Sequence, residues 1–250
     1  MKTDEKIKKK LESQDPWYTT DQIQSSLHGC VKRVIEGRQR YFYQVISEHL
    51  KYKNHLVILD AGCGDGVNLI LLNNFIGTTV YGMDYNPLRT IRAKKKIQDS
   101  SILQGDLLEL PFKEQTFDVI LLNQVLEHIP EDGAVLRELY RSLKQDGLLI
   151  ISVPNEGCSL GRLRNNVLQR SILRTTDHVH FYTEQQMISL LNSNKWNIRE
   201  IRREGFFTPY TYLHNFLAMF DLTFSFLQYL TKKYPSQCAG LLFICLKQET

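Results

Sequence analysis

The sequence predicts an α/β protein with a doubly wound, mostly parallel sheet of seven strands. A short apolar strand, 57–61, runs directly into the glycine-rich stretch 62–66, and an amphipathic stretch, 67–75, follows. A second short strand, 79–84, ends on an aspartate. A further strand, 117–122, is apolar almost throughout, which is typical of the centre of a parallel sheet covered on both faces. These stretches predict strands that alternate with helices.

Composition and charge are those of an ordinary globular chain. Of the 250 residues, 42% are hydrophobic and 23% are charged, so a full core is expected and wholesale disorder is excluded. The formal net charge of +4 permits an anionic partner without requiring one. The five cysteines include no C-x-x-C pair, so neither a disulfide framework nor a zinc site is expected. Because the N-terminus has no apolar signal-peptide region, the expected location is the cytoplasm.

The N-terminal part of the chain is expected to be helical. Apolar residues recur at helical spacing through 21–50, and this pattern predicts two helices separated near Gly37. Residues 1–20 are rich in charge and predict a solvated, frayed helix. The alternative is that Trp17 and Tyr18 anchor a flap over the functional site.

Two start signals place later helices. Asparagine is a good N-cap and proline suits the first turn, so Asn86 and Pro87 predict a helix start. Thr183 with Gln186 three residues later is the capping-box pattern. A turn is expected at 146–147, before the fifth strand. The other expected helices are 87–97, 129–143 and 184–191, and the other expected strands are 102–104, 148–153, 197–204 and 240–247.

The glycine-rich stretch is expected to hold a cofactor. A strand that turns sharply into a helix, with its backbone close to a ligand, needs glycine because a Cβ blocks both. The pattern is Asp60-x-Gly62-x-Gly64-x-Gly66, whereas dinucleotide folds use G-x-G-x-x-G. Asp60 also places a negative charge where a pyrophosphate would lie, so a cationic, phosphate-free cofactor fits better. Asp84 ends the second strand, the place from which an acid binds ribose hydroxyls.

The D-x-G-x-G-x-G loop resembles motif I of the class I S-adenosylmethionine-dependent methyltransferases. Asp84 matches the family's ribose-binding acid, and Asp106 matches the acid that binds the adenine amino group, although a plain turn residue is the alternative there. The phrases at 110–120 and 177–183 are similar to those of ubiquinone/menaquinone-type enzymes. The resemblance implies a Rossmann-like methyltransferase fold and an enzyme of class EC 2.1.1.- with S-adenosyl-L-methionine as cofactor. The cofactor-binding residues expected on this basis are Asp60, Gly62, Cys63, Gly64, Asp84, Tyr85, Asp106, Leu107 and Asn123.

Candidate catalytic residues follow the fourth and fifth strands. Methyl transfer from a sulfonium is an in-line displacement, in which the protein supplies alignment and, where needed, a base. His128 and His178 are the candidate bases, with His180 near the second, because histidine titrates near neutral pH. Glu127 precedes His128 and is the third catalytic candidate. The alternative for the Glu127-His128 pair is a structural contact at a helix end.

A metal-dependent variant is the alternative for the same residues. In small-RNA 3′-end methyltransferases and quinone-biosynthesis O-methyltransferases, an E-x-x-E-H phrase and a later histidine hold a divalent metal. This chain is similar at 124–128 and has His178 at a matching later place, but Gln124, a weaker neutral ligand, stands where the first glutamate is expected. No metal is therefore expected, which predicts undiminished methylation after chelation.

We expect an N-terminal helical cap, 1–52, and a methyltransferase domain, 53–250, with an apolar helical insertion, 206–236, between the last two strands. Polar residues interrupt the apolar run 206–230, which makes it a poor membrane span. Such a run predicts a packed lid or dimer contact, or else contact with a lipid surface or an apolar substrate tail. The connection 154–182 is rich in arginine and is expected either to meet an anionic group or to be a plain exposed loop.

The acceptor is expected to be a small molecule or a lipid-linked metabolite, methylated on an oxygen. Peripheral contact with the inner face of a membrane through 206–230 is compatible with this. One alternative is an RNA or nucleoside methyltransferase, suggested by the lysines at 94–96, although a solvated helix face is favoured there over nucleic acid. A second alternative is a non-catalytic cofactor-binding partner protein. The sequence does not indicate an oligomeric state.

Overall fold

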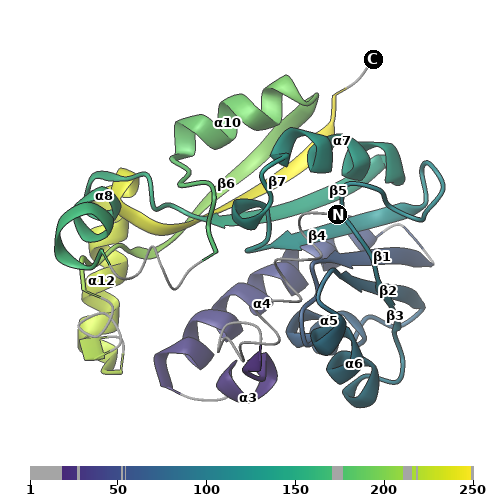
Figure 1. Ribbon diagram of the computed structural model, residues 1–250, viewed down its shortest axis with the longest axis horizontal. Helices are drawn as coiled ribbons and strands as arrows, with labels where there is room; N and C mark the ends of the chain where they lie inside the picture. Colours follow the sequence, from purple (N-terminus) through teal and green to yellow (C-terminus); the bar gives the residue numbers. More distant parts are fainter. Residues whose placement is uncertain are drawn as a thin grey trace. The chain divides into compact units, whose positions relative to one another are not determined.

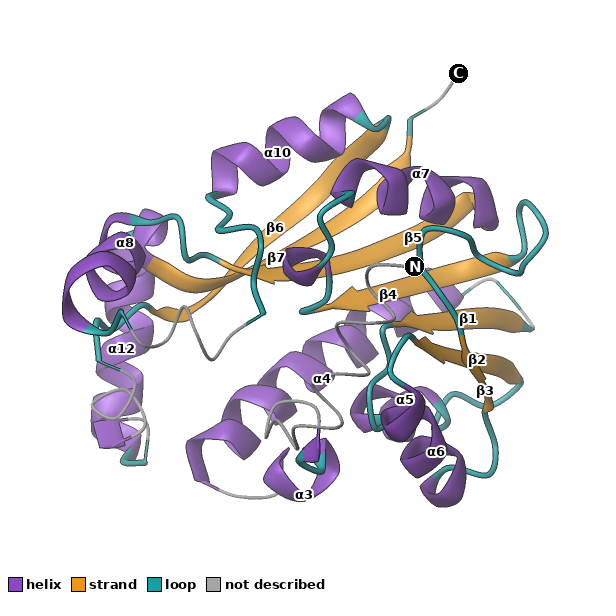
Figure 2. Cartoon of the chain, viewed as in Figure 1, coloured by secondary structure: helices purple, strands orange, loops and turns teal. Residues whose placement is uncertain are grey.

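The protein is described from a computed structural model, which covers residues 19–26, 29–51, 53, 55–170, 177–210, 216–217 and 219–248. Its seven strands form one sheet with the order β3-β2-β1-β4-β5-β7-β6 (Figure 1). β7 runs antiparallel to both of its neighbours, whereas the pairs within β1–β3 and the β4–β5 pair are parallel (Figure 2). The predicted seven-stranded, mostly parallel sheet is thus confirmed. The chain divides into two compact units, Met1–Pro111 and Phe112–Thr250.

The first unit contains three parallel strands and the helices beside them. These elements are α3 Gln22–Ser26, α4 Gly29–Leu50, β1 Leu56–Ala61, α5 Val67–Leu72, β2 Thr78–Asp84, α6 Pro87–Lys96 and β3 Ser101–Gln104. Asp60 in β1 pairs with Gly82 in β2, and Asp84 in β2 pairs with Gln104 in β3. Because the strands are parallel, their carboxyl ends lie at one edge, where the glycine loop begins.

The prediction of a break near Gly37 is wrong. α4 runs without interruption through Gly37, where an added Cβ would meet nothing within 4 Å. Glycine inside a helix costs only about 1 kcal/mol relative to alanine. Burial of the apolar face, which includes Phe42 and Ile46, outweighs that cost. The expected helix at 1–20 and the flap at Trp17 and Tyr18 lie almost wholly outside the described residues.

The second unit contains the remaining strands. Its elements are β4 Phe117–Asn123, the 3-10 helix η1 Leu126–His128, α7 Asp132–Ser142, β5 Leu143–Pro154, α8 Ser159–Leu163, the π-helix η2 Arg164–Leu168, α10 Glu184–Ser193, β6 Trp196–Phe206, α12 Asp221–Lys233, η3 Pro235–Gln237 and β7 Cys238–Lys247. Both α10 and α12 contact β6 (Figure 1). α12 lies between β6 and β7 in the chain, so the predicted helical insertion is confirmed, although 211–215 and 218 lie outside the described residues.

Two stretches are more regular than the sequence predicts. The turn expected at 146–147 lies inside β5, whose pairing with β4 shifts register between Phe117 and Val119. Such an irregularity lets a strand absorb a turn-like pair of residues without ending. The connection 154–182 is predicted to be a loop, but α8 and η2 occupy part of it.

The capping box of α10 is confirmed in both directions. The Thr183 hydroxyl accepts a hydrogen bond from the Gln186 N–H at 3.3 Å, and the Gln186 side chain accepts one from the Thr183 N–H at 2.9 Å. We expect Thr183→Ala to lower the free energy of unfolding by about 1 kcal/mol, because the Gln186 N–H at the helix start loses the hydroxyl that accepts its hydrogen bond. Urea denaturation followed by circular dichroism measures this. Gln185→Ala, at an exposed position in the same turn, is the control and should change stability by less than about 0.5 kcal/mol.

Candidate functional site

The glycine loop has the backbone that its sequence predicts. Gly62, Gly64 and Gly66 have φ angles of 78°, 55° and 91°, all in the left-handed region that disfavours other residues. The N–H groups of Gly62 and Cys63 both donate to the Met83 carbonyl, at 2.7 and 2.9 Å. An added Cβ on Gly66 would overlap Cδ1 of Ile97, so this glycine also lets the loop pack against the end of α6. The loop is therefore bound tightly to the end of β2.

Asp84 is the residue that holds the loop. One carboxylate oxygen accepts a hydrogen bond from the Gly64 N–H and the other accepts one from the Asn86 N–H, both at 2.8 Å. Asn86 in turn caps α6 by accepting from the N–H groups of Leu88 and Arg89. Burial raises the pKa of Asp84, and the two backbone donors act against this rise. A carboxylate fixed in this way is suited to accept further hydrogen bonds from vicinal hydroxyls.

Asp60 lies at the end of β1 with no solvent exposure. Burial raises the pKa of Asp60 to about 7, against an opposing effect of the Asn68 side chain, and the charge of Asp84 adds to the rise. A cation bound near this carboxyl would favour its charged form. Burial also raises the pKa of the neighbouring Cys63 thiol, so the thiol stays protonated and apolar in character. Asp60 is thus suited to an ammonium or sulfonium group, as the sequence suggested.

The remaining cofactor candidates of the first unit follow β2 and β3. Tyr85 comes directly after Asp84 and is half-buried. Asp106 follows β3, and its carboxylate accepts a hydrogen bond from the Leu108 N–H at 2.9 Å, which is the turn role that the sequence also allowed. Leu107 is buried. The first unit thus brings together every cofactor candidate except one.

Asn123 is that exception, because it ends β4 in the second unit. Its side-chain oxygen accepts a hydrogen bond from the Ser152 hydroxyl at 2.6 Å. Gln124 follows with a φ of 58°, and its side-chain amide donates to the same hydroxyl at 3.3 Å. Gln124 therefore joins the end of β4 to Ser152 of β5.

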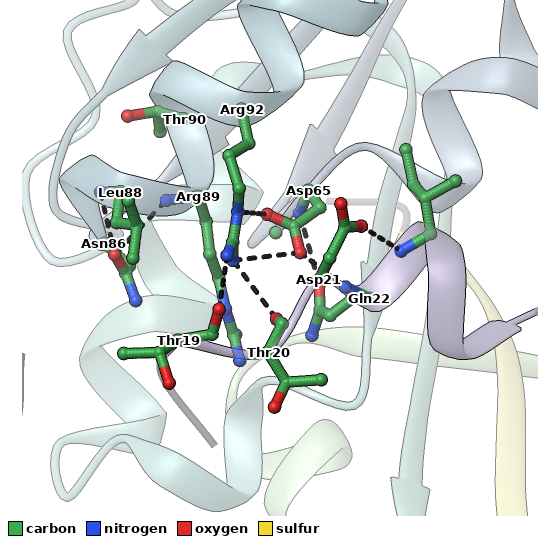
Figure 3. Close-up of polar contacts among 12 residues, drawn as sticks. Thr19, Thr20, Asp21, Gln22, Asp65, Asn86, Leu88, Arg89, Thr90 and Arg92 are labelled. Carbon is green, nitrogen blue, oxygen red and sulfur yellow. Dashed lines mark hydrogen bonds and ion pairs between the residues drawn. The ribbon is translucent and has the colours of Figure 1, made fainter. Parts of the chain in front are cut away.

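A set of contacts that the sequence did not reveal joins residues 19–22 to Asp65 in the glycine-rich stretch (Figure 3). The Asp65 carboxylate is fully buried and binds the Arg92 guanidinium through two contacts, at 2.7 and 3.1 Å. Arg92 also donates to the carbonyls of Thr19 and Thr20, and the Gln22 N–H donates to Asp65 at 2.6 Å. We name residues 19–22 the strap. Arg92 holds it and the loop together.

The strap lies directly on the loop. The Gln22 side-chain oxygen accepts a hydrogen bond from the Asp65 N–H at 3.2 Å. The same oxygen overlaps the place that a Cβ on Gly64 would occupy, so glycine is needed there for the contact as well as for its φ angle. Asp21, which also belongs to the strap, forms an ion pair with Lys96 of α6. This lysine, one of the three predicted to form a solvated face, is therefore engaged within the chain.

The three catalytic candidates form a cluster in the second unit. The ligand atoms of Glu127, His128 and His178 all lie within 4.8 Å of one another. The two imidazole rings meet edge to face, with centroids 4.8 Å apart. Glu127 is 1% exposed. We name these three residues the histidine–glutamate cluster.

Backbone hydrogen bonds fix the two segments that form this cluster. The Glu127 carbonyl accepts from the N–H groups of Val179 and His180, at 2.8 and 3.2 Å. His180 itself binds the carbonyl of Ile129 through its ring, at 3.0 Å. The third histidine of the sequence prediction thus has a structural contact, whereas His178 lies in the cluster.

Glu156 orients His178. Its carboxylate lies 2.7 Å from Nδ1 of His178, and it also pairs with Arg164. Burial alone would lower the pKa of His178, but the hydrogen bond and the charge of Glu156 prevail and raise it. Burial by itself would raise the pKa of Glu156. The hydrogen bond to His178 and the charges of His178 and Arg164 outweigh burial, so the pKa of Glu156 is lowered. Sequence reasoning missed Glu156, because it lies 22 positions from its partner and no local pattern marks it.

Two of the described arginines of the connection 154–182 bind backbone carbonyls of their own segment. Arg162 donates to the Gly157 carbonyl at 2.9 Å, and Arg170 contacts the Asn166 carbonyl. Arg174 lies outside the described residues. Contact of these arginines with an anionic group stays a prediction.

The comparison with protein families matches the central part of the chain. Residues 59–151 match the family described as "Methyltransferase domain". A demethylmenaquinone methyltransferase of Lactobacillus johnsonii is 34% identical over 119 residues, which are 44% of this chain and 49% of the relative. A sterol 24-C-methyltransferase of Pneumocystis carinii is 32% identical over 125 residues, 45% of this chain and 33% of the relative. The chain therefore matches about half or less of the length of these relatives.

Solved structures agree on the fold. An S-adenosylmethionine-dependent methyltransferase of Mesorhizobium loti superimposes with a TM-score of 0.58 at 16% identity, covering 85% of this chain and all of that one. Taken with the glycine loop, Asp84 and the family match, this confirms the resemblance found in the sequence. The chain carries a class I S-adenosylmethionine-dependent methyltransferase domain. S-adenosyl-L-methionine is the cofactor of such domains.

Proposed function

We propose that this protein transfers a methyl group from S-adenosyl-L-methionine to an oxygen of an apolar, lipid-linked small molecule. The observation that carries the first half of the proposal is the carboxylate of Asp84, which is fixed by two backbone N–H groups at the edge of the glycine loop. Asp84 would accept hydrogen bonds from the ribose hydroxyls. Asp60, buried beside it in the sheet, would neutralise the cationic amino acid end of the cofactor.

The other cofactor contacts follow from position in the fold. Ligands of doubly wound sheets bind beyond the carboxyl ends of the strands. Tyr85, Asp106 and Leu107 follow such ends, and Asn123 is the last residue of β4. Gly62, Cys63 and Gly64 supply the backbone of the loop. In the proposed complex Asp106 keeps one oxygen for its own turn and offers the other to the adenine amino group.

The apolar character of the acceptor is inferred from α12. Large apolar side chains are exposed on and just before this helix, and exposed patches of this kind usually mark interaction sites. They are Phe216, Met219, Phe220, Leu222, Phe226 and Tyr229. The two relatives named above carry the names of a lipid quinone and a sterol, which favours the same class of acceptor. None of the helices in the described part of the chain has the length and apolar composition to cross a membrane. A peripheral contact with a lipid surface is the arrangement we propose.

Transfer to an oxygen releases a proton. The hydroxyl of the acceptor attacks the methyl carbon, the carbon–sulfur bond breaks, and S-adenosylhomocysteine and one proton leave. The histidine–glutamate cluster is the group that we assign to prepare the hydroxyl for this step, because it gathers two imidazoles and a carboxylate in one place.

The test is a transfer assay with methyl-labelled cofactor and three acceptors: a prenylated hydroquinone in micelles, a water-soluble hydroquinone, and total RNA. We expect the prenylated compound to be labelled at least about tenfold faster than the soluble one, since each buried methylene contributes about 0.8 kcal/mol. Mass spectrometry of the product should place the methyl group on oxygen. Label in RNA alone would contradict the proposal.

Variants of α12 test in the same assay whether this helix binds the apolar part of the acceptor. Leu222→Ser with Phe226→Ser removes two exposed apolar side chains one turn apart, and it should slow labelling of the prenylated compound about tenfold while leaving the soluble one unchanged. Ile91→Ser, at a similarly exposed apolar position on α6, is the control and should change neither rate. Equal rates for the α12 variant and the control on the prenylated acceptor would remove α12 from acceptor binding.

A further inference from the structure

The second unit contains a cavity that the proposed function does not use. Its volume is about 490 Å³, and parts of four segments line it: 155–162, 183–185, β6 at Arg203, and 235–237. Sites for small molecules commonly measure about 300–1,000 Å³, so the cavity has room for such a ligand. The residues assigned to the cofactor and the histidine–glutamate cluster are absent from its described lining.

The charged side chains of the described lining leave one positive charge uncompensated. They are Arg162, Glu184 and Arg203. Both carboxylate oxygens of Glu184 accept hydrogen bonds from Arg203, at 2.6 and 2.7 Å, so these two residues neutralise each other. Arg162 donates through Nε to the Gly157 carbonyl at 2.9 Å, and its two terminal nitrogens have no acceptor in the described part of the chain. Arg162 is exposed, so the free side of its guanidinium is accessible to a ligand.

Hydrogen bonds between the lining segments fix the cavity and use most of its neutral polar groups. The Gln237 side-chain oxygen accepts from the Ser159 hydroxyl at 2.9 Å and from the Leu160 N–H at 3.1 Å. The Asn155 amide donates to two backbone carbonyls at and just before the start of β7. The Gln185 side chain is exposed and has no hydrogen-bond partner among the described residues. Two donors are therefore left for a ligand, the guanidinium and this amide, on walls that need little further ordering.

We propose that this cavity binds the phosphate group of a phosphate monoester, with Arg162 as the main contact and Gln185 as the second donor. A guanidinium donates two parallel hydrogen bonds to two oxygens of one anion. A phosphate monoester has three such oxygens, so one remains for the second donor, whereas a carboxylate has none left. The monoester belongs either to a free metabolite or to a lipid headgroup. A headgroup is compatible with the position of the lining residue Pro235, two positions after the end of α12 and its exposed apolar side chains.

The first arm of the test is an NMR titration of the isotope-labelled full chain with glycerol 3-phosphate, without methyl donor or acceptor. Arg162→Gln should raise the Kd at least about tenfold, because charge-assisted hydrogen bonds to the phosphate are lost. Arg162→Lys keeps the charge without the planar fork and should give an intermediate Kd. Gln185→Glu leaves Arg162 in place but adds a like charge beside the phosphate, which should raise the Kd at least about threefold. Arg199→Gln, at an exposed position of β6 outside the cavity, is the matched control and should bind as the unaltered chain does.

The second arm is co-sedimentation with phosphatidylcholine vesicles that contain phosphatidic acid, and with matched vesicles in which oleic acid replaces it. Binding to the phosphatidic acid vesicles alone, weakened by Arg162→Gln, would identify a lipid headgroup as the source, whereas the same dependence for glycerol 3-phosphate alone would identify a free metabolite. Dependence on Arg162 in both arms supports the phosphate site for both sources. Two results would overturn it: no binding in either arm at millimolar phosphate ester, or equal effects of Arg162→Gln and Arg199→Gln. Neither result bears on the proposed methyl transfer, which the labelled-cofactor assay tests by itself.

Discussion

Asp84→Ala is expected to weaken binding of S-adenosylhomocysteine at least about 100-fold. A hydrogen bond to a charged acceptor contributes about 1.5–3 kcal/mol, and the proposed complex has two such bonds to the ribose. The same carboxylate binds the Gly64 N–H, so its removal also releases the glycine loop. Isothermal titration calorimetry with S-adenosylhomocysteine measures the loss without any acceptor.

The control for this experiment is Asp99→Ala, which removes an exposed acid from the same unit outside the loop. It should leave the affinity within about twofold. Asp84→Asn separates binding of the ribose from support of the glycine loop. The amide oxygen still accepts a hydrogen bond from the Gly64 N–H, but it lacks the negative charge. An intermediate affinity is expected for Asp84→Asn. Binding by Asp84→Ala that equals the unaltered chain would remove Asp84 from the cofactor site and with it the main support of the proposed function.

The parts of the fold that the sequence predicted well are those fixed by local interactions. Thr183 and Gln186 are three residues apart and cap α10 through their own backbone. The positive φ angles of Gly62, Gly64 and Gly66 follow from the absence of a Cβ within a single turn. Strand β4 was predicted from an apolar run that lies wholly within it. In each case the residues that determine the local structure lie within that same helix, turn or strand.

The sequence failed where a local signal was outweighed or where the partner is distant. Gly37 indicated a break, but the buried face of α4 on either side of it sustains the helix. The sequence gives no sign that Arg92 on α6 is paired, because its partner Asp65 is 27 positions away. No pattern in one sequence identifies such a pair, because several other acidic residues in the chain are equally plausible partners for Arg92.

The second large effect is expected at that pair. Arg92→Ala should lower the free energy of unfolding of the first unit by about 3–5 kcal/mol, because it leaves a carboxylate without its cation in a place with no access to water. The Asp65 side chain is fully buried and that of Arg92 is 18% exposed. The strap at Thr19 and Thr20 loses its anchor at the same time. Urea denaturation monitored by far-ultraviolet circular dichroism measures the change.

A double variant decides whether the ion pair or the size of Arg92 is responsible. Asp65→Asn combined with Arg92→Met removes both charges while keeping much of the volume, and the amide oxygen that replaces the carboxylate still accepts from the Gln22 N–H. Because no buried charge remains, this double variant should be more stable than Arg92→Ala alone. Lys32→Ala, which breaks the exposed pair with Glu36 on α4, should cost less than about 0.5 kcal/mol. If Arg92→Ala costs no more than Lys32→Ala, the strap is not held by Arg92, and the loop owes its shape to Asp84 and the glycines alone.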